Sequence, residues 1–292
     1  MIGQAQAYGA ISILNALANG MGITVSVNLK TRAIVRLFKG RGSWKISINN
    51  QQNDSKLAIM SIHQALKVAG EHPTSYHGIV ETYTTIPLGV GLKSSSSSSL
   101  SIIMATLQAL GKDNFDKEEV LKASVNASLK AGVSITGALD DSASCLLGGM
   151  NFTDNVNRKI ILSKKLAEDL NVIIKLPLER SRRPVIDLKK VRSFHGVANS
   201  IFDSCMKGKI WSSMIMNGML YSMLLGYESD HALTALNYGA LGAGLSGTGP
   251  ATAAVFYPDD KLSMAKLKAA WRSDGSEVIM TRTNNESGGF IQ

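Results

Sequence analysis

Apolar and polar residues alternate in three short segments near the start of the chain, at 23–29, 33–38 and 44–49. Alternation with a period of two is typical of a β-strand with one buried face. A fourth segment at 79–86 has the same character and stops at Pro87. The pattern therefore predicts four strands in the first third of the chain.

Other segments repeat their apolar residues at helical spacing. We expect a helix over 54–69, with Asp54 as its capping residue. Apolar residues recur at intervals of three and four from Leu100 to Leu110, which predicts a helix that follows directly on a run of serines. A further helix is expected over about 116–131, where the acidic residues form a capping-box-like start.

The second half of the chain alternates between the two patterns again. Strands are predicted at 150–154, 170–177, 251–257 and 276–283, and helices around 187–205, 209–225, 229–239 and 259–271. There is no repeat with a period of 20–50 residues. The chain is therefore predicted to be an α+β protein with two lobes, residues 1–149 and residues 150–292.

Residues 1–29 carry no charged side chain, so a targeting or membrane segment has to be considered. Polar residues and glycines interrupt each apolar run, and no apolar stretch of 18 residues occurs. We therefore expect a cytoplasmic protein without a membrane partner.

Sulfur-containing side chains and histidines indicate neither a disulfide framework nor a metal site. The two cysteines, Cys145 and Cys205, are expected to be reduced thiols in or near the core. The five histidines show no metal-ligand spacing. Four methionines of the helix predicted at 209–225 are interpreted as core or interface residues: Met214, Met216, Met219 and Met223.

The net charge of +9 favours an anionic partner. Aromatic residues make up only 6% of the chain and no recognition motif for nucleic acid is present, so we expect no nucleic-acid partner. Small molecules that carry phosphate or carboxylate groups fit the charge equally well.

The segment 87–100, PLGVGLKSSSSSSL, could be a flexible linker or an anion site. Its position between a strand and a helix favours the anion site, because the N–H groups and partial positive charge of a helix N-terminus bind phosphate. Gly89 and Gly91 would allow close approach of a ligand, Lys93 would add a charge, and the hydroxyls of Ser94 to Ser97 could bind phosphate oxygens or magnesium. The common nucleotide-binding loop is absent, because Lys93 follows a leucine where that motif needs a glycine.

Two further segments carry candidate chemistry. The glycine-rich 242–249 contains Gly-x-Gly-x-x-Gly, but it lies between a helix and a strand, the reverse of a dinucleotide site, and can also be an ordinary turn. Asp140 and Asp141 precede a short apolar helix in 134–149. Such carboxylates can cap a helix, hold magnesium or accept a proton from an attacking hydroxyl.

Three segments in this order resemble the motifs of the GHMP kinases. Pro87-x-x-x-Gly91-Leu92-x-Ser94-Ser95-Ser96 resembles the ATP loop of that family, and 136–141 with the following Gly148-Gly149 resembles its catalytic-aspartate segment. The segment 244–250, GLSGTGP, is similar to its C-terminal glycine motif. The resemblance implies a two-lobed fold, with a mixed α/β lobe followed by a ferredoxin-like lobe, and an active site in the cleft between them that binds ATP and Mg²⁺.

Within this family, the residues Tyr8-Gly9-Ala10, the segment 16–31, the sequence GLKSSS and the sequence SITGALDD resemble archaeal-type shikimate kinases. That resemblance implies phosphorylation of the 3-hydroxyl of shikimate by ATP, in the biosynthesis of aromatic compounds. It also implies cofactor-binding, substrate-binding and catalytic residues. The cofactor-binding residues would be Pro87, Gly89, Gly91, Leu92, Lys93, Ser94, Ser95, Ser96 and Ser97, with Ser95 at magnesium. The substrate-binding residues would be Tyr8, Arg180, Arg182, Arg183, Ser246, Gly247, Thr248 and Gly249, with the arginines at the carboxylate.

The resemblance leaves two aspartates for one catalytic position. Counting back from Gly148-Gly149 indicates Asp141, whereas counting forward from Gly137 indicates Asp140, and we prefer Asp141. The family's magnesium-binding glutamate has no clear match, since Glu118 and Glu119 are the nearest upstream acids. Another GHMP kinase, such as one acting on homoserine, and a non-catalytic protein that binds anions or nucleic acid remain the alternatives. The sequence leaves a monomer or a homodimer open.

Overall fold

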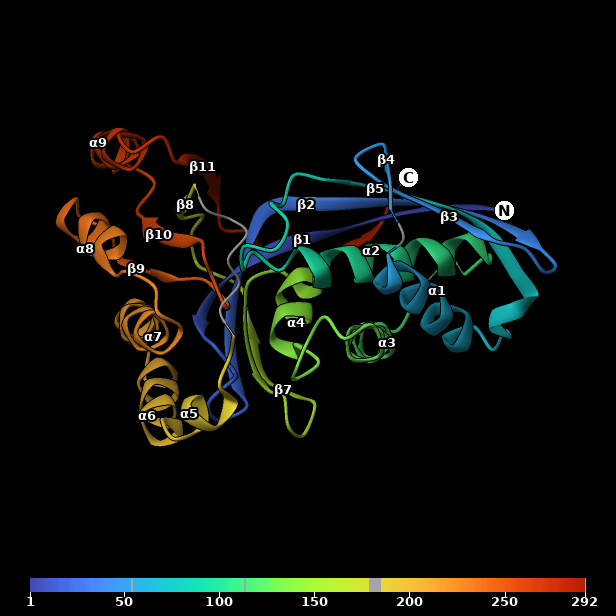
Figure 1. Cartoon of the computed structure of the whole chain (residues 1–292), viewed down its shortest axis with the longest axis horizontal. Coiled ribbons are helices and arrows are strands. Elements are labelled where there is room, and N and C mark those ends of the chain that lie inside the picture. The colour runs from blue at the N-terminus through green and yellow to red at the C-terminus, as the bar shows by residue number, and fades with distance from the viewer. Residues whose placement is uncertain (54, 113, 179–184, 292) are drawn as a thin grey trace.

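The computed structural model describes residues 1–53, 55–112, 114–178 and 185–291. In these residues the strands form two sheets, each covered by helices (Figure 1). The strands are β1 (Ile2–Leu14), β2 (Met21–Lys39), β3 (Trp44–Ile48), β4 (Gln51–Gln52), β5 (Tyr76–Thr84), β6 (Met150–Asp154), β7 (Lys159–Lys164), β8 (Asn171–Leu176), β9 (Gly242–Leu245), β10 (Thr252–Phe256), β11 (Glu277–Arg282) and β12 (Gly289–Phe290). The helices are α1 (Lys56–Val68), α2 (Ser94–Ala109), α3 (Lys117–Ala131), α4 (Leu139–Leu147), α5 (Leu188–Arg192), α6 (His195–Met206), α7 (Ile210–Leu225), α8 (Asp230–Asn237) and α9 (Lys261–Arg272), with a 3₁₀ turn at Pro73–Ser75.

The first sheet has the order β12-β1-β2-β5-β3-β4, and β6 pairs with both β2 and β7. Its neighbours are antiparallel except for the parallel pair β3 and β5. Helices α1 to α4 lie together below this sheet in the view of Figure 1. The buried side chains of these helices form one core with the side chains on the lower face of the sheet.

The second sheet is antiparallel, with the order β11-β8-β10-β9. Its strands and intervening helices follow one another as β8, α6–α7, β9, β10, α9 and β11, which is the ferredoxin-like arrangement. Helices α7, α8 and α9 lie on its outer side in Figure 1. The predicted α+β fold with a ferredoxin-like second lobe is confirmed.

The largest core joins the two sheets. It combines residues from the inner ends of β1 and β2 and from β6 with residues of β8, α6 and α7. Phe152 of β6 is fully buried there and meets the ring of Phe202 of α6 edge to face, with 6.2 Å between ring centroids. Strands β6, β7 and β12 come from the chain beyond residue 149 but belong to the first sheet, so pairing continues across the proposed boundary at 149/150. That boundary stays a prediction.

Several predicted elements have other bounds. The segments 23–29 and 33–38 are parts of one strand, β2, because Lys30 and Arg32 point to solvent while Thr31 is buried, which keeps the alternation unbroken. The charge-free start of the chain forms β1, for which no strand was predicted. The first helix is capped by Ser55, whose side chain accepts from the Ala58 N–H, and Asp54 lies outside the described residues.

Two further predictions need correction. The helix expected over 187–205 is divided into α5 and α6, and the Ser193 hydroxyl at the division donates to the Lys190 carbonyl. The first half of the glycine-rich segment 242–249 is strand β9 rather than a turn. Among the described residues, no helix combines the length and the apolar character that crossing a bilayer requires.

Phe152→Ala is expected to lower the free energy of unfolding by about 3–5 kcal/mol, because it opens a cavity in the core that joins the two sheets. Denaturant unfolding of the purified protein measures the change. Phe38→Ala is the matched control, since Phe38 is 48% exposed and should cost much less. Equal losses in the two variants would contradict this account of the core.

Candidate functional site

A cleft of about 290 Å³ lies where the three candidate motifs meet. Its wall includes residues 15–17 after β1, the loop and first turn of α2, the loop and first turn of α4, and residues 247–248 after β9. The serine loop, the aspartate pair and the glycine-rich segment are about 50 to 150 residues apart in the chain, yet the fold brings them to one place.

The first turn of α2 presents free N–H groups to this cleft. Lys93 precedes the helix in a left-handed conformation, with φ 67°, and its side chain makes no capping hydrogen bond. The N–H groups of Ser94, Ser95 and Ser96 therefore have no partner within the helix, as at any uncapped N-terminus. The hydroxyl of Ser97 donates to the Ala7 carbonyl at 2.9 Å and so fixes this turn against β1.

The first turn of α4 reaches the same cleft. Ala138 precedes this helix in a left-handed conformation, again without a side-chain cap. Asp140 is buried: its Oδ1 accepts from Asn155 Nδ2 at 2.8 Å, and its own N–H donates to Asn155 Oδ1 at 3.1 Å. Burial, with the neighbouring charge of Asp141, raises the pKa of Asp140 to about 6. Asp140 is therefore held in place by Asn155, whereas Asp141 has a different partner.

An ion pair joins the two helix starts. Lys93 Nζ lies 2.8 Å from Asp141 Oδ1, and the two side chains are 6% and 21% exposed. Burial alone would lower the pKa of Lys93, but the negative charges of Asp141 and Asp140 outweigh it, so the pKa is raised and the ammonium stays charged. A phosphoryl group in the cleft would lie beside this fixed positive charge.

The ion pair is also tied to the glycine-rich segment. Lys93 Nζ donates to Ser12 Oγ at 2.9 Å, and the same oxygen accepts from the Gly247 N–H at 3.0 Å. The Ser246 hydroxyl donates to the Gly91 carbonyl at 2.8 Å. A Cβ on Gly91 would lie 2.0 Å from the Ser246 carbonyl oxygen, so the two loops approach as closely as only glycine allows.

The structure brings most of the candidate residues to the cleft, but not all. Its lining contains Gly89, Gly91, Lys93, Ser94, Ser95, Ser96, Asp140, Asp141, Gly247 and Thr248. Ser95 is the exposed serine of the first turn of α2. The following candidates are not part of the lining: Pro87, Leu92, Ser97, Ser246, Gly249 and Tyr8. Leu92 and Ser97 are fully buried behind it, and Ser246 supports the loop from the side.

Tyr8 has another partner. Its hydroxyl donates to Glu286 Oε2 at 2.6 Å, and burial together with that bond raises the pKa of Tyr8 to about 12. Arg180, Arg182 and Arg183 lie outside the described residues. Glu118 pairs with Lys122 at 2.6 Å on exposed side chains of α3, away from the cleft lining.

Sequence reasoning missed the polar residues that hold the cleft from behind. Ser12 binds Lys93, Asn155 binds Asp140, and Asn15 donates from its Nδ2 to the Gly247 carbonyl at 2.9 Å. Asn15 and Asn155 each directly follow a strand, and this position is the one feature of the sequence that could have marked them as candidate site residues. Their partners are distant in the chain, so the signal alone does not give their roles.

Comparisons with known proteins agree with this geometry. The family model for the GHMP kinases N terminal domain matches residues 58–149. A shikimate kinase of Methanothrix thermoacetophila is 34% identical over 287 residues, which cover 98% of this chain and 96% of that protein. A shikimate kinase of Methanosarcina acetivorans is 36% identical, with 97% and 94% covered.

The chain belongs to the GHMP kinase family. Solved structures of GHMP kinases have the same fold. A homoserine kinase from Cytophaga hutchinsonii superimposes with a TM-score of 0.75 at 21% identity, covering 99% of this chain and 97% of that one. A mevalonate kinase from Methanococcus jannaschii gives 0.73 at 13% identity, covering 97% and 98%. The family predicted from the three motifs is confirmed, and so is an ATP-dependent small-molecule kinase.

Gly91→Ala should weaken the contact between the loop before α2 and the glycine-rich segment, because its methyl group would meet the Ser246 carbonyl. Gly111→Ala is the matched control: Gly111 also has a positive φ, but open space surrounds it, so only about 1–2 kcal/mol of left-handed strain is expected. Denaturant unfolding should give a clearly larger loss for Gly91→Ala, and kinetics should give a raised KM for ATP. The same loss in both variants, with KM unchanged, would contradict the close approach.

Lys93→Gly is expected to lower kcat by roughly 10²–10³-fold, as found for loss of a fixed group that stabilises transition-state charge. Glycine adopts the left-handed backbone of this position without strain, so the change removes the ammonium and keeps the start of α2. Lys112→Gly, at an exposed lysine just beyond α2, is the control and should keep its kcat. Steady-state kinetics decides, and a wild-type kcat for Lys93→Gly would overturn the role of the ion pair.

Proposed function

We propose that the protein transfers the γ-phosphoryl group of ATP to the 3-hydroxyl of shikimate. The observation that carries the proposal is the Lys93–Asp141 pair, which lies between two uncapped helix N-termini in one cleft. The shikimate kinases of Methanothrix thermoacetophila and Methanosarcina acetivorans, similar over nearly the whole chain, support the choice of acceptor.

The first turn of α2 is the proposed site of the ATP phosphates. Its N–H groups and the positive end of the helix dipole favour anionic oxygens. Gly89 and Gly91 in the loop before it line the cleft. The charged Lys93 would then lie beside the phosphoryl group that is transferred, where negative charge accumulates on its oxygens.

The residues of the cleft suit magnesium bound together with ATP. Mg²⁺ takes hard oxygen ligands, keeps several waters and needs only one or two protein groups beside the phosphates. The exposed hydroxyl of Ser95 at the start of α2 is such a group. Among the described residues no cluster of three His, Cys, Asp or Glu side chains could hold a metal by itself. Bound there, magnesium would neutralise charge on the phosphates.

Asp141 is the proposed acceptor of the hydroxyl proton. Its side chain faces the cleft, whereas both the N–H and the side chain of Asp140 are bonded to Asn155. In the reaction the 3-hydroxyl oxygen bonds to the γ-phosphorus, the bond from that phosphorus to ADP breaks, and the hydroxyl proton passes to Asp141. Lys93 holds the carboxylate in place and stabilises the developing charge.

The carboxylate of shikimate needs a cationic partner, and we propose Arg180, Arg182 and Arg183. All three lie outside the described residues, but Ile186, a few positions further along the chain, lines the cleft. Homoserine carries its own ammonium group, so a site with several arginines would suit it less well than shikimate.

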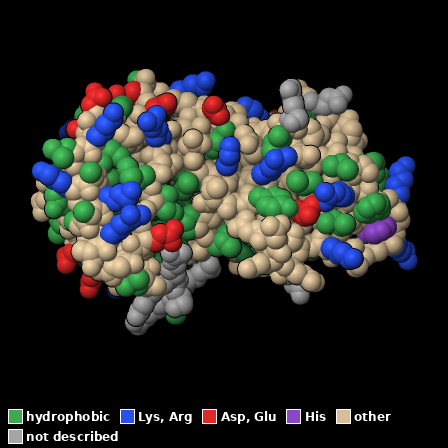
Figure 2. Space-filling model, turned by 90° about the horizontal axis from the view of Figure 1, so that it is seen from above, with side chains coloured by type: hydrophobic (Ala, Val, Ile, Leu, Met, Phe, Trp, Pro, Cys, Tyr) green, Lys and Arg blue, Asp and Glu red, His purple; other side chains and the backbone are tan. Residues whose placement is uncertain are grey.

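This proposal accounts for the net charge of +9 without a nucleic-acid partner. On the face shown in Figure 2, Lys and Arg side chains lie singly or in small groups over both lobes, with acidic and apolar side chains between them. A protein that binds nucleic acid through its charge gathers basic residues in a patch or stripe. The scattered pattern on this face favours small anionic ligands.

A coupled assay of ATP consumption with shikimate, homoserine and mevalonate side by side tests the proposal. We expect turnover with shikimate and a background rate with the other two. Turnover with homoserine or mevalonate alone would disprove the substrate and keep the kinase family. No turnover with any acceptor would contradict the kinase reaction itself.

Asp141→Asn is the control that assigns the turnover to this cleft, and it should lower kcat by about 10²–10⁴-fold through loss of the proton acceptor. Asp140→Asn is the matched variant, and its kcat should fall less because Asn155 already occupies that side chain. If Asp140→Asn is inactive while Asp141→Asn keeps its activity, the two roles are reversed.

A further inference from the structure

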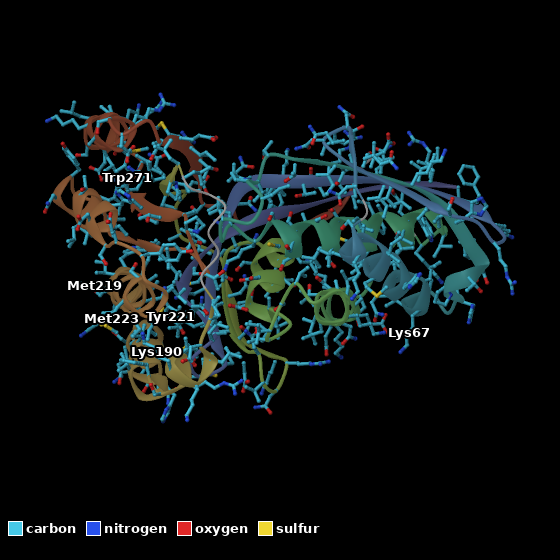
Figure 3. The ribbon with its side chains drawn as sticks, viewed as in Figure 1. Lys67, Lys190, Met219, Tyr221, Met223 and Trp271 are labelled. Atoms are coloured by element: carbon cyan, nitrogen blue, oxygen red, sulfur yellow. The ribbon has the colours of Figure 1, made fainter. Side chains whose placement is uncertain are left out.

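A surface pocket of about 450 Å³ lies where the C-terminal ends of α1 and α3 come together. It is lined by His63, Gln64 and Lys67 of α1, by residues 70–73 of the loop after α1, and by Lys130 of α3. Figure 3 shows Lys67 at the lower edge of the first lobe, by α1 and α3. The pocket shares no lining residue with the cleft described above, so the kinase reaction gives it no role.

Two lysines bring positive charge to this pocket. Lys67 and Lys130 stand in the last turns of two different helices, and both are exposed. Neither ammonium group forms an ion pair or a hydrogen bond with any residue that the structure describes. A lysine in a last turn often caps helix carbonyls, but in α1 the loop already does so, since the Leu66 carbonyl accepts from the Glu71 N–H at 2.8 Å. Both ammonium groups can therefore bind one anion.

A buried amide in the same lining also lacks a partner. Gln64 is only 6% exposed and lines the pocket. Within the described ranges of the chain, its side-chain amide makes no hydrogen bond. A buried amide without a partner is unfavourable, so such groups are normally satisfied by the protein, by water or by a ligand. The N–H groups of this amide can donate to the oxygens of an anion.

Two imidazoles add further donors. His72 Nδ1 accepts from the Thr74 N–H at 3.3 Å, so the proton of the neutral ring lies on Nε2, which can donate to a ligand. Burial and the charge of Lys130 lower the pKa of His63, so the two basic groups act on each other across the pocket. An anion bound between them would relieve this repulsion.

The acidic residue of the lining has a partner of its own. Burial, together with the charge and hydrogen bond of Glu71, raises the pKa of the Tyr76 hydroxyl. Tyr76 is not part of this lining, so the Glu71 carboxylate is bonded outside the pocket. The two ammonium groups therefore leave the pocket with an excess of positive charge.

We propose that this pocket binds a phosphate group, as inorganic phosphate or as the monoester of a small molecule. Two lysine ammonium groups match the double negative charge of phosphate, and lysine binds phosphate as a point charge. The Gln64 amide and His72 Nε2 donate to the remaining oxygens. This binding is independent of the kinase reaction in the cleft.

The five histidines of the chain allow the binding to be located in the full-length protein. Their ring C–H signals are followed by NMR while inorganic phosphate is added at constant ionic strength, and His63→Gln and His72→Gln assign the two pocket signals. These two signals should shift and saturate, and the pKa of His63 should rise, because a bound anion favours the imidazolium. The signals of His195 and His231, in the second lobe, should stay unchanged. A titration with glycerol 3-phosphate shows which form binds with the lower Kd, and either order supports the site.

Variants of the lining test which groups hold the phosphate. Lys130→Gln should raise the Kd for phosphate about tenfold, as for loss of one charge-assisted hydrogen bond. Gln64→Met keeps the length of the side chain without its amide and should raise the Kd several-fold. Lys112→Gln is the matched control, because Lys112 is exposed and lies outside the pocket. Lys93→Gly should keep the shifts, which separates the pocket from the cleft.

Thermal unfolding of each variant shows that the chain stays folded. Shifts that do not saturate, equal shifts at all five histidines, or the same Kd for Lys130→Gln and Lys112→Gln would each overturn the site. Loss of the shifts in Lys93→Gly would assign the phosphate to the cleft and overturn the pocket as well. An inactive kinase that keeps the shifts would contradict the proposed reaction and leave the pocket supported.

Discussion

The ion pair between Lys93 and Asp141 is the interaction on which the rest of the site depends. Each partner stands at or near the start of a different helix, so the pair fixes the relative position of two helix N-termini. A buried ammonium is costly unless it is paired and hydrogen-bonded, and here Asp141 and Ser12 meet that requirement. The pair therefore holds the two helix N-termini and their charges in place before any ligand arrives.

That geometry requires the two sheets to be held firmly together. The long strands β1 and β2 contribute their inner ends to the core shared with β8, α6 and α7. Ser12 and Asn15 sit at the end of β1, where this shared core ends and the cleft begins. The two sheets thus meet at Ser12 of β1, whose hydroxyl oxygen accepts from Lys93 Nζ and from the Gly247 N–H of the segment after β9.

Helix α7 links this site to the outer surface. Its inner residues Asn217 and Tyr221 hold Asn15, which lines the cleft, and its outer methionines are exposed. The same helix therefore supports the cleft on one side and reaches the surface on the other.

Local sequence was sufficient for most elements and for the three motifs. Strand alternation, helical spacing and capping depend on neighbouring residues, so the strands at 150–154 and 171–176 and the helix at 210–225 followed from pattern alone. The pattern did not show that 23–29 and 33–38 are parts of one strand. Lys30 and Arg32 interrupt the apolar run, but they lie on the exposed face and so do not interrupt the strand. The serine loop, the aspartate pair and the glycine-rich segment could be named as candidates, since their residue types have few other common uses together.

Tertiary structure alone decided how those candidates work together. Asp140 and Asp141 are adjacent and chemically identical in the sequence. Only the fold shows that Asp140 accepts a hydrogen bond from Asn155 and that Asp141 forms an ion pair with Lys93. The same holds for the methionines of α7, where burial at 1% makes Met214 part of the core while Met216, Met219 and Met223 remain exposed. The physical reason is that burial and ion pairing are set by residues far away in the chain, whereas sequence pattern reports only on neighbours.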